Sequence, residues 1–478
     1  MSLSKLNYVN AGTKGTFKAS GDFQSTPADV DAIIDHLRTS GKQHVVVHLH
    51  GGLISESKGM AIAEKMIAPY EAAGAHPVSL VYETGFMETL LGNLRTIHET
   101  KLFGKLLKYA RKYVAKKLGV EFDGLEGAGD AEPDLERPAK ELESHPWFTV
   151  LEEAAADGKP EMGLEGLEAA DDEVDQEEIE DWLMDDDEMR PVLLQDLTNP
   201  VVNRESLDAP GEGPEGLISW GKTAWTILKV GKRVVTRLWT KRDHGAYCTL
   251  VEELLREAFL ADFGQWTWDA MKQKAHDLFS SNVDVQGTDQ HAGRYLADAL
   301  AALQAENSDF KVDIVGHSLG TVAACELLDA TAGSLTIRNI AFLAPAVRTD
   351  VAHASLVAKP ERFEKFRLFT MSDKYEVDDE LLGVVYPRSL LYLISGALEK
   401  TEVDETIFGM ARHLTGVSPY DEDHLMDIVA YLRDDPSRAV WSVTDTGAPA
   451  GHRSTSEDHG GFDDDDETRA SLTHFLQS

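Results

Sequence analysis

The sequence predicts an α/β protein in which a mostly parallel central sheet is flanked by helices. Short β-branched runs alternate with helical patterns near both ends of the chain, as in sheets whose strands run parallel. One run, 44–50, stops at two glycines. Another, 312–315, leads into the stretch G-H-S-L-G at 316–320 and then into a helical pattern. These three observations place the chain in the α/β class.

The N-terminal elements follow from local signals. A helix over 26–37 begins with a capping threonine, Thr26, and has a proline at its first helical position. The β-branched run 44–50 predicts a strand, 58–73 a helix and 77–83 the next strand.

Regular alternation resumes near residue 249 and continues to the C-terminus. The predicted helices are 249–259, 266–279, 292–304, 319–329 and 467–476, and the predicted strands are 312–315, 337–343, 366–371 and 439–443.

Ser318 lies where a strand, two glycines and a helix predict a sharp turn. The glycines relieve crowding, so the turn can present the serine hydroxyl at the carboxyl end of the strand. The stretch G-H-S-L-G resembles the nucleophile elbow of the α/β-hydrolase superfamily, in the form common among lipases and esterases. This resemblance implies the α/β-hydrolase fold and a catalytic set in the chain order serine, acid, histidine.

The resemblance also implies an oxyanion hole, built from a loop after an early strand and from the amide that follows the serine. The stretch H-G-G-L at 50–53 is similar to that loop. The expected donors are therefore the amides of Gly52 and Leu319, with Leu53 an alternative on the first loop. His50 itself is expected to brace the loop.

The resemblance places the acid after a later strand. Asp373 comes directly after the strand 366–371 and is the predicted acid. Asp350, after the preceding strand, is the alternative. Asp378 and Asp379 are expected to be solvated loop charges.

The resemblance places the histidine after the last strand and before the final helix. His459 lies there, on a glycine-rich loop, and His452 on the same loop is its rival. A serine hydroxyl needs a neutral imidazole to take its proton, and the imidazole needs a carboxylate to fix its tautomer. Ser318, His459 and Asp373 supply these groups in the implied order.

The chain is expected to have one hydrolase core, 1–85 and 246–478, interrupted by a cap insertion over 86–245. The net charge of −37 is unevenly spread. Residues 121–217 hold 32 acidic and 5 basic residues, and this composition predicts a largely disordered segment. The flanking stretch 95–119 holds 8 basic residues and one acidic residue, and the stretch 220–242 holds 7 basic residues and no acidic residue.

Both basic stretches predict amphipathic helices, most clearly over Lys101–Leu118 and Trp220–Trp239. A basic polar face opposite an apolar face is typical of helices that lie on a membrane surface. The alternative is a cap helix that packs on protein and leaves its lysines in water. A further hypothesis is that the acidic segment folds back onto the basic faces and holds a cap closed.

These features predict a serine hydrolase of carboxylic esters, lipase- or phospholipase-like, that works through an acyl-enzyme. The alternatives are a thioesterase or peptidase, or a non-catalytic binding protein with the same fold.

The net negative charge argues against nucleic-acid binding. No metal, nucleotide or other cofactor site is expected. The N-terminus lacks a signal-peptide pattern and no apolar run could cross a bilayer, so a cytoplasmic protein, peripheral to a membrane at most, is expected.

Overall fold

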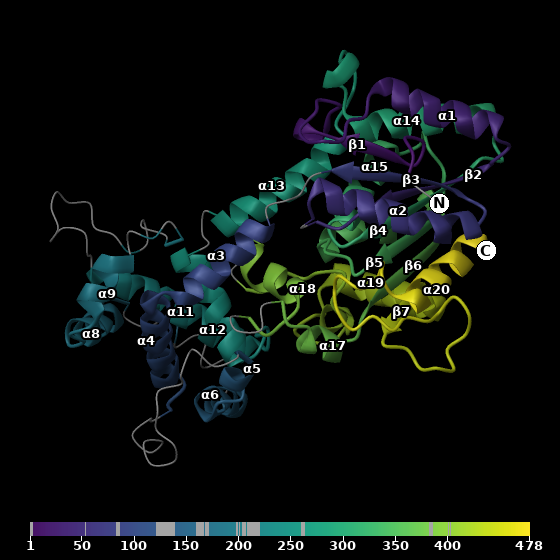
Figure 1. Cartoon of the computed structure of the whole chain (residues 1–478). Coiled ribbons are helices and arrows are strands. Elements are labelled where there is room, and N and C mark those ends of the chain that lie inside the picture. Colours follow the sequence, from purple (N-terminus) through teal and green to yellow (C-terminus); the bar gives the residue numbers. More distant parts are fainter. Residues whose placement is uncertain are drawn as a thin grey trace. The chain divides into compact units, whose positions relative to one another are not determined.

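The computed structural model of the chain divides into two compact units (Figure 1). The sheet unit comprises Met1–Glu88, Asp269–Asp379 and Thr406–Ser478, and the helical unit comprises Thr89–Trp268 and Glu380–Glu405. The structure describes residues 3–52, 54–82, 87–120, 139–158, 167, 172–196, 199, 201–202, 207, 220–259, 263–381, 386–399, 401 and 403–478.

Seven parallel strands form the centre of the sheet unit, in the order β1-β3-β2-β4-β5-β6-β7. Their bounds are Tyr8–Ala11, His44–Leu49, His76–Tyr82, Lys311–His317, Ile337–Leu343, Phe363–Met371 and Ala439–Ser442 for β1 to β7. The predicted strands are confirmed, and β1 is an additional short strand that pairs with β3 at one edge. The predicted α/β-hydrolase fold is therefore correct.

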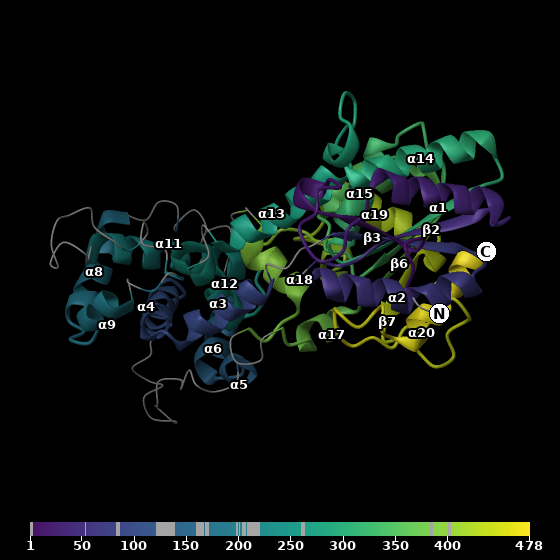
Figure 2. The same cartoon turned by 45° about the horizontal axis from the view of Figure 1, so that its top comes forward.

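Helices cover both faces of this sheet, as parallel strands buried on both sides require. Helices α1 (Pro27–Thr39) and α14 (Ala292–Glu306) pack together on one face, with α15 (Gly320–Ala330) beside them. Helices α2 (Glu56–Ala72) and α20 (Asp466–Gln477) pack together on the other (Figure 2). The capping box of Thr26 and Asp29 and the proline at the first position start α1, as predicted.

The strand register brings three loops to one edge of the sheet. Leu49 of β2 pairs with Gly316 of β4, and His317 of β4 pairs with Leu343 of β5. The residues that follow these strands therefore emerge next to one another. Ligands of open α/β sheets bind at such carboxyl ends, so this edge is where a site is expected.

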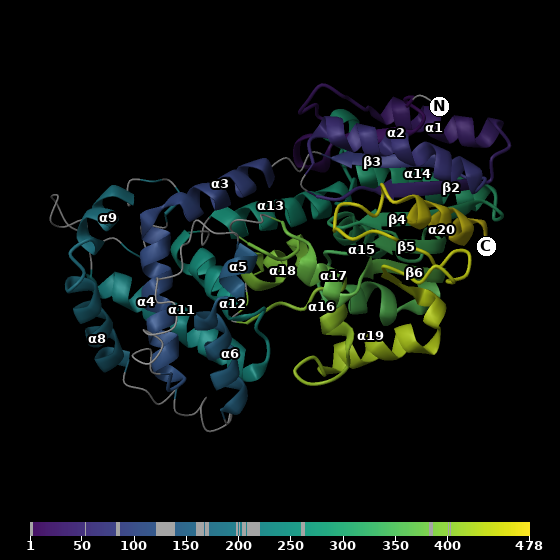
Figure 3. The same ribbon diagram turned by 60° about the horizontal axis from the view of Figure 1, so that its bottom comes forward.

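The helical unit contains the two basic helices predicted from the sequence, α4 (Lys101–Lys117) and α11 (Trp220–Thr240). Most of their apolar residues are buried, although Trp225 of α11 is exposed. On α4 the buried ones include Leu102, Phe103, Leu106, Tyr109, Ala110, Tyr113 and Val114. Helix α11 packs against α4, α12 (Ala246–Leu254) and α8 (Asp172–Met184) (Figure 3). The apolar faces thus contact protein, and this favours internal packing over lipid contact.

The acidic range 121–217 contains helices where a largely disordered segment was expected. They are α5 (Ala139–Glu143), α6 (Pro146–Asp157), α8 and α9 (Met189–Asp196), while 121–138 and most of 197–219 lie outside the described residues. Composition alone underestimates order here, because a few apolar side chains, among them Phe148, Ile179 and Leu183, are fully buried.

Helix α8 lies on the basic faces of α4 and α11. Asp175 accepts hydrogen bonds from the Tyr113 hydroxyl at 3.1 Å and pairs with Lys117 at 2.5 Å. Asp186, just after α8, accepts from the Tyr109 hydroxyl at 2.7 Å and pairs with Lys105 at 2.8 Å. Lys232 of α11 and Lys116 of α4 also pair with acids of α8. Within this unit, acidic residues therefore do fold back onto the basic helices.

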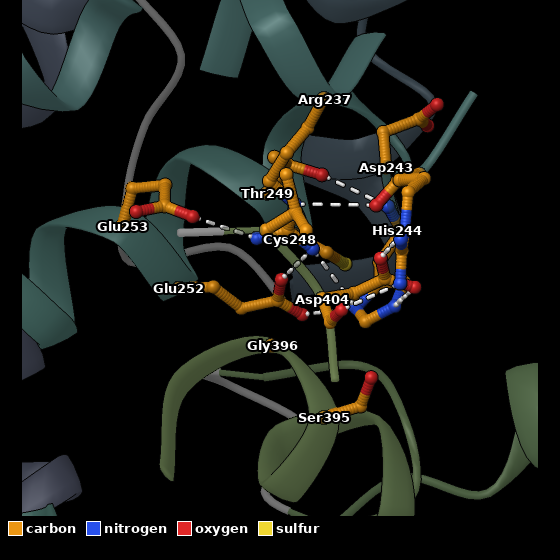
Figure 4. Close-up of polar contacts among 12 residues, drawn as sticks. Arg237, Asp243, His244, Cys248, Thr249, Glu252, Glu253, Ser395, Gly396 and Asp404 are labelled. Carbon is orange, nitrogen blue, oxygen red and sulfur yellow. Dashed lines mark hydrogen bonds and ion pairs between the residues drawn. The ribbon is translucent and has the colours of Figure 1, made fainter. Parts of the chain in front are cut away.

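A buried ionic network joins α11, α12 and the segment that ends at Glu405 (Figure 4). Arg237 of α11 pairs with Glu252 at 2.7 Å and with Glu253 at 2.9 Å, and all three side chains are fully buried. His244 bonds Glu252 at 2.8 Å. Gly396 makes room for this network, because a Cβ there would lie 2.2 Å from the Glu252 carboxyl group.

Among the described residues, no helix is both long enough and apolar enough to cross a bilayer.

Candidate active site

Ser318 lies on a strained turn between β4 and α15. Its backbone has φ of 50°, a left-handed conformation that a non-glycine residue rarely adopts. The amide of Ser318 donates to the carbonyl of Leu343 at 2.9 Å, and its own carbonyl accepts from the amide and hydroxyl of Thr321. Strain held by surrounding hydrogen bonds is typical of functional positions.

Gly316 and Gly320 of the motif are required because neither position has room for a side chain. A Cβ on Gly316 would lie 2.9 Å from the carbonyl oxygen of Gly320. A Cβ on Gly320 would lie 2.0 Å from the carbonyl oxygen of Leu49, on the neighbouring strand. Both distances are shorter than a carbon atom tolerates, so the sequence G-x-S-x-G allows the tight approach of this turn to β2.

The loop that follows β2 lies against this turn. A Cβ on Gly51 would lie 3.4 Å from the Ser318 Cβ, and one on Gly52 would lie 3.0 Å from the side chain of Leu319. The structure thus brings Gly52 and Leu319, the two predicted oxyanion donors, into contact. Leu53, the alternative donor, lies outside the described residues.

His50 anchors this loop to Tyr82 at the end of β3. Its Nε2 accepts from the backbone amide of Tyr82 at 3.1 Å, and the Tyr82 hydroxyl donates to the His50 carbonyl. The two rings stack with centroids 4.5 Å apart. Burial lowers the pKa of His50 to about 4, so the ring is neutral and serves as an acceptor.

His459 is the histidine that contacts the serine. Its Nε2 lies 2.8 Å from the Ser318 Oγ, although the two residues are 141 positions apart in the chain. Burial, together with the charge of His317, lowers the pKa of His459 to about 3. A neutral imidazole on a serine hydroxyl is the arrangement needed for a general base.

The rival histidine lies elsewhere on the same loop. His452 lines an open depression beside the edge strand β7, together with Trp441 and Thr444. The structure places His459, and not His452, on Ser318.

The predicted acid does not contact the histidine ring. Nδ1 of His459 is buried and has no hydrogen-bond partner within the described part of the chain. Asp373 is the half-buried first residue of the short helix α17 (Asp373–Asp378). Asp350, the alternative, forms a bidentate pair with Arg348.

Asp379 comes closer than either of these. Its Oδ2 accepts a hydrogen bond from the backbone amide of His459 at 2.9 Å. The sequence suggested a solvated charge here, because Asp379 lies within an acidic stretch and follows a helix too short to be predicted. The order of β6, α17 and Asp379 along the chain was the only signal available.

A second carboxylate, that of Asp463, lies close to His317, the residue before Ser318. Asp463 is almost fully buried, and its Oδ2 lies 3.7 Å from Nδ1 of His317. The other ring nitrogen of His317 bonds the carbonyl of His459. The sequence does not distinguish Asp463, because it begins a run of four aspartates that resembles a solvated turn.

The alternating histidines of β2 do not share a site. His44 bonds Asp313 at 2.6 Å, and His48 bonds the hydroxyl of Tyr70 at 2.6 Å. Each ring therefore has its own partner on a neighbouring element.

Comparison with known proteins gives one match. The model of a family of α/β hydrolases of unknown function, DUF900, matches residues 263–377. The matched segment contains β4, the turn with Ser318, β5 and β6, and it ends before Asp379 and His459. No curated protein and no solved structure matches the chain.

Proposed function

We propose that this chain, which belongs to the α/β-hydrolase superfamily, is a serine hydrolase that cleaves carboxylic esters through an acyl-enzyme. The observation that carries the proposal is the 2.8 Å contact of Ser318 Oγ with His459 Nε2 on a strained turn. The glycine loop beside it supports the same reading, since ester cleavage needs donors for an oxyanion.

In the proposed reaction His459 takes the proton of Ser318 as the hydroxyl oxygen attacks the ester carbonyl. The amides of Gly52 and Leu319 stabilise the oxyanion that forms, and removal of one such donor typically costs about 100- to 1000-fold in rate. His459 then gives its proton to the departing alcohol. Water, activated by the same imidazole, releases the acid and regenerates Ser318.

We assign the acid of this reaction to Asp379, with Asp373 as the alternative. The Asp379 carboxylate already contacts the backbone of His459, and Asp379 lies between Ser318 and His459 in the chain, as the superfamily order requires. The buried Nδ1 of His459 has no hydrogen-bond partner among the described residues, so it lacks the acceptor that the reaction requires.

The two acids can be separated by amide substitutions. In serine proteases, replacing this acid by its amide costs about 10⁴-fold in kcat. We expect a loss on the order of 10³- to 10⁴-fold for Asp379→Asn and a loss below about 3-fold for Asp373→Asn. The opposite order of the two variants would transfer the role to Asp373.

The proposed substrates are carboxylic esters as a class, and the proposal names no lipid head group. The preference for lipids was predicted from the amphipathic helices α4 and α11, and their apolar faces are buried in the helical unit. An ester panel of graded acyl length, with and without anionic vesicles, measures the acyl preference and any activation by a lipid surface.

The central test is covalent labelling with a fluorophosphonate probe, which reacts with activated serines. Wild-type protein should be labelled and Ser318→Ala should not, while Ser334→Ala, on a different loop, serves as the matched control. His459→Gln should also abolish labelling, because the serine then lacks its base. Equal labelling of wild type and Ser318→Ala would contradict the proposal.

A further inference from the structure

His317, the residue before the proposed nucleophile, holds two parts of the loop that carries His459. Its Nε2 lies 3.1 Å from the carbonyl oxygen of His459, and its Nδ1 lies 3.7 Å from Oδ2 of Asp463. The side chains of His317 and Asp463 are 7% and 5% exposed, so water does not compete for these contacts.

The partners define the protonation state of the His317 ring. A carbonyl oxygen only accepts hydrogen bonds, so Nε2 of His317 carries a proton. Nδ1 faces Oδ2 of Asp463 at 3.7 Å, within ion-pair distance but too far for a hydrogen bond, and this oxygen has no hydrogen-bond partner among the described residues. A proton on Nδ1 makes the ring an imidazolium and completes an ion pair with that carboxylate, one residue from Ser318 in the chain.

The surrounding charges support this state. Burial lowers the pKa of His317, but Asp463 outweighs that effect, and the pKa lies above its ordinary value. Burial likewise raises the pKa of Asp463, but His317 outweighs it, and the pKa lies below its ordinary value. Other titratable groups also act on this pair: His48 on β2, His50 after β2, Lys65 and Tyr70 on α2, and Asp458 and His459 on the loop.

We propose that His317 and Asp463 form a buried positioning pair that fixes the His459 loop to the serine turn and sets the alkaline limit of activity. The inference rests on the proposed function. Neither residue touches the reacting atoms; both act through the position of His459.

The composition of the loop from His459 to Asp463 makes the position of His459 depend on this pair. Gly460 and Gly461 separate His459 from Asp463, and two glycines leave that segment free to move unless its ends are held. Phe462 between the glycines and Asp463 is buried in the core and holds the far side. Loss of the imidazolium would weaken one of two contacts on the His459 backbone and leave only the hydrogen bond from its amide to Asp379.

The pH dependence follows from the direction of the shift. The pKa of His317 is raised, so the pair is intact below it and is lost as the pH rises through it. Activity should therefore fall on an alkaline limb above pH 6.5, the ordinary histidine value. Removing the Asp463 charge should move this limb to lower pH.

The test compares three full-length variants by pH–rate profiles on a soluble ester. Asp463→Asn should lower kcat about 10- to 100-fold with little change in KM, the scale of a small misplacement of a reacting group, and should shift the alkaline limb downward by at least about one unit. His317→Gln keeps a donor for the carbonyl but does not titrate, so its alkaline limb should disappear. Asp464→Asn is the matched control, because Asp464 is the adjacent, exposed acid and pairs with Lys65.

Unchanged alkaline limbs in folded Asp463→Asn and His317→Gln would overturn the positioning role. A ¹⁵N-histidine NMR titration tests the pair without using activity. It should show both nitrogens of His317 protonated at about pH 6 in wild type, because the pKa lies above the ordinary histidine value, and a lower titration midpoint in Asp463→Asn. A neutral His317 at that pH overturns the inference, whereas an absence of Ser318-dependent hydrolysis with a charged His317 overturns the proposed function alone.

Discussion

Arg237 in the helical unit offers a sharp test of how the buried network contributes to stability. Its guanidinium pairs with Glu252 and Glu253 (Figure 4). Its Nε donates to the carbonyl of Arg242. Replacing Arg237 by Met preserves much of the apolar volume and removes the cation nearest to both carboxylates, although Glu253 keeps Arg256 at 3.4 Å. The matched control is Arg233→Met, one turn earlier on α11, whose side chain is 30% exposed and pairs with Glu257 at 3.0 Å and more distantly with Glu253 at 3.7 Å.

The magnitude can be estimated in two ways. Removing one partner of a buried ion pair typically costs about 3–5 kcal/mol, against about 0.2–1 kcal/mol for an exposed pair. Independently, burial raises the pKa of Glu252, but His244 and Arg237 bring it from 4.5 down to about 2. At about 1.4 kcal/mol per pKa unit this corresponds to about 3 kcal/mol, an order-of-magnitude value.

The sign of the pH dependence provides a second observable. Because the pKa of Glu252 is depressed, its contribution to stability is present above pH 4.5 and is lost as the pH falls toward 2. In Arg237→Met the carboxylates can relieve their unpaired charge by protonation. The difference in unfolding free energy between wild type and this variant should therefore shrink as the pH falls below 4.5.

Urea unfolding followed by tryptophan fluorescence measures this effect. Seven of the eight tryptophans lie in the helical unit, so the signal reports mainly on that unit even where the two units unfold separately. We expect Arg237→Met to lose about 3–5 kcal/mol and Arg233→Met less than about 1 kcal/mol at pH 7. Equal losses for the two variants, or a difference that does not change with pH, would refute the reasoning.

Two further predictions concern the serine turn and helix α8. Gly320→Ala places a Cβ 2.0 Å from the Leu49 carbonyl and should abolish fluorophosphonate labelling while lowering the thermal midpoint, whereas Gly92→Ala, with open space around it, should do neither. Asp175→Asn removes the charge that Lys117 and Tyr113 share, and it should lower the free energy of local opening of α8 by about 1–3 kcal/mol, measured by amide hydrogen exchange. Exchange in α8 that equals wild type would show that its apolar contacts alone hold it.

The parts of the sheet unit that local patterns specify were predictable from the sequence. Strands such as β2 and β4 are continuous β-branched runs, and G-x-S-x-G between a strand and a helix has few other structural uses. His459 could be placed because its loop lies between a recognisable strand and the final helix. These signals are local, so no knowledge of tertiary contacts was needed.

The acid and its surroundings could not be predicted in the same way. Asp373, Asp379 and Asp463 all lie in acidic loop segments, and nothing in their local sequence distinguishes a buried carboxylate from a solvated one. Their roles depend on which loop packs under the His459 ring. Strand β1 was missed for a related reason, because four residues are too few to show an alternating pattern.

The charge pattern of the helical unit shows why an amphipathic helix does not by itself specify a membrane. Lys105, Tyr109, Tyr113 and Lys117 of α4 lie at spacings of four residues, so these two lysines and two buried tyrosines form one stripe along the helix. An anionic lipid surface could satisfy such a stripe, but so can carboxylates of the same chain. Asp175 and Asp186 each bind one lysine and one tyrosine of the stripe, at its two ends. Asp175 and Asp186 and the basic helices are therefore complementary parts of one folded unit, and neither charge pattern taken alone predicts this pairing.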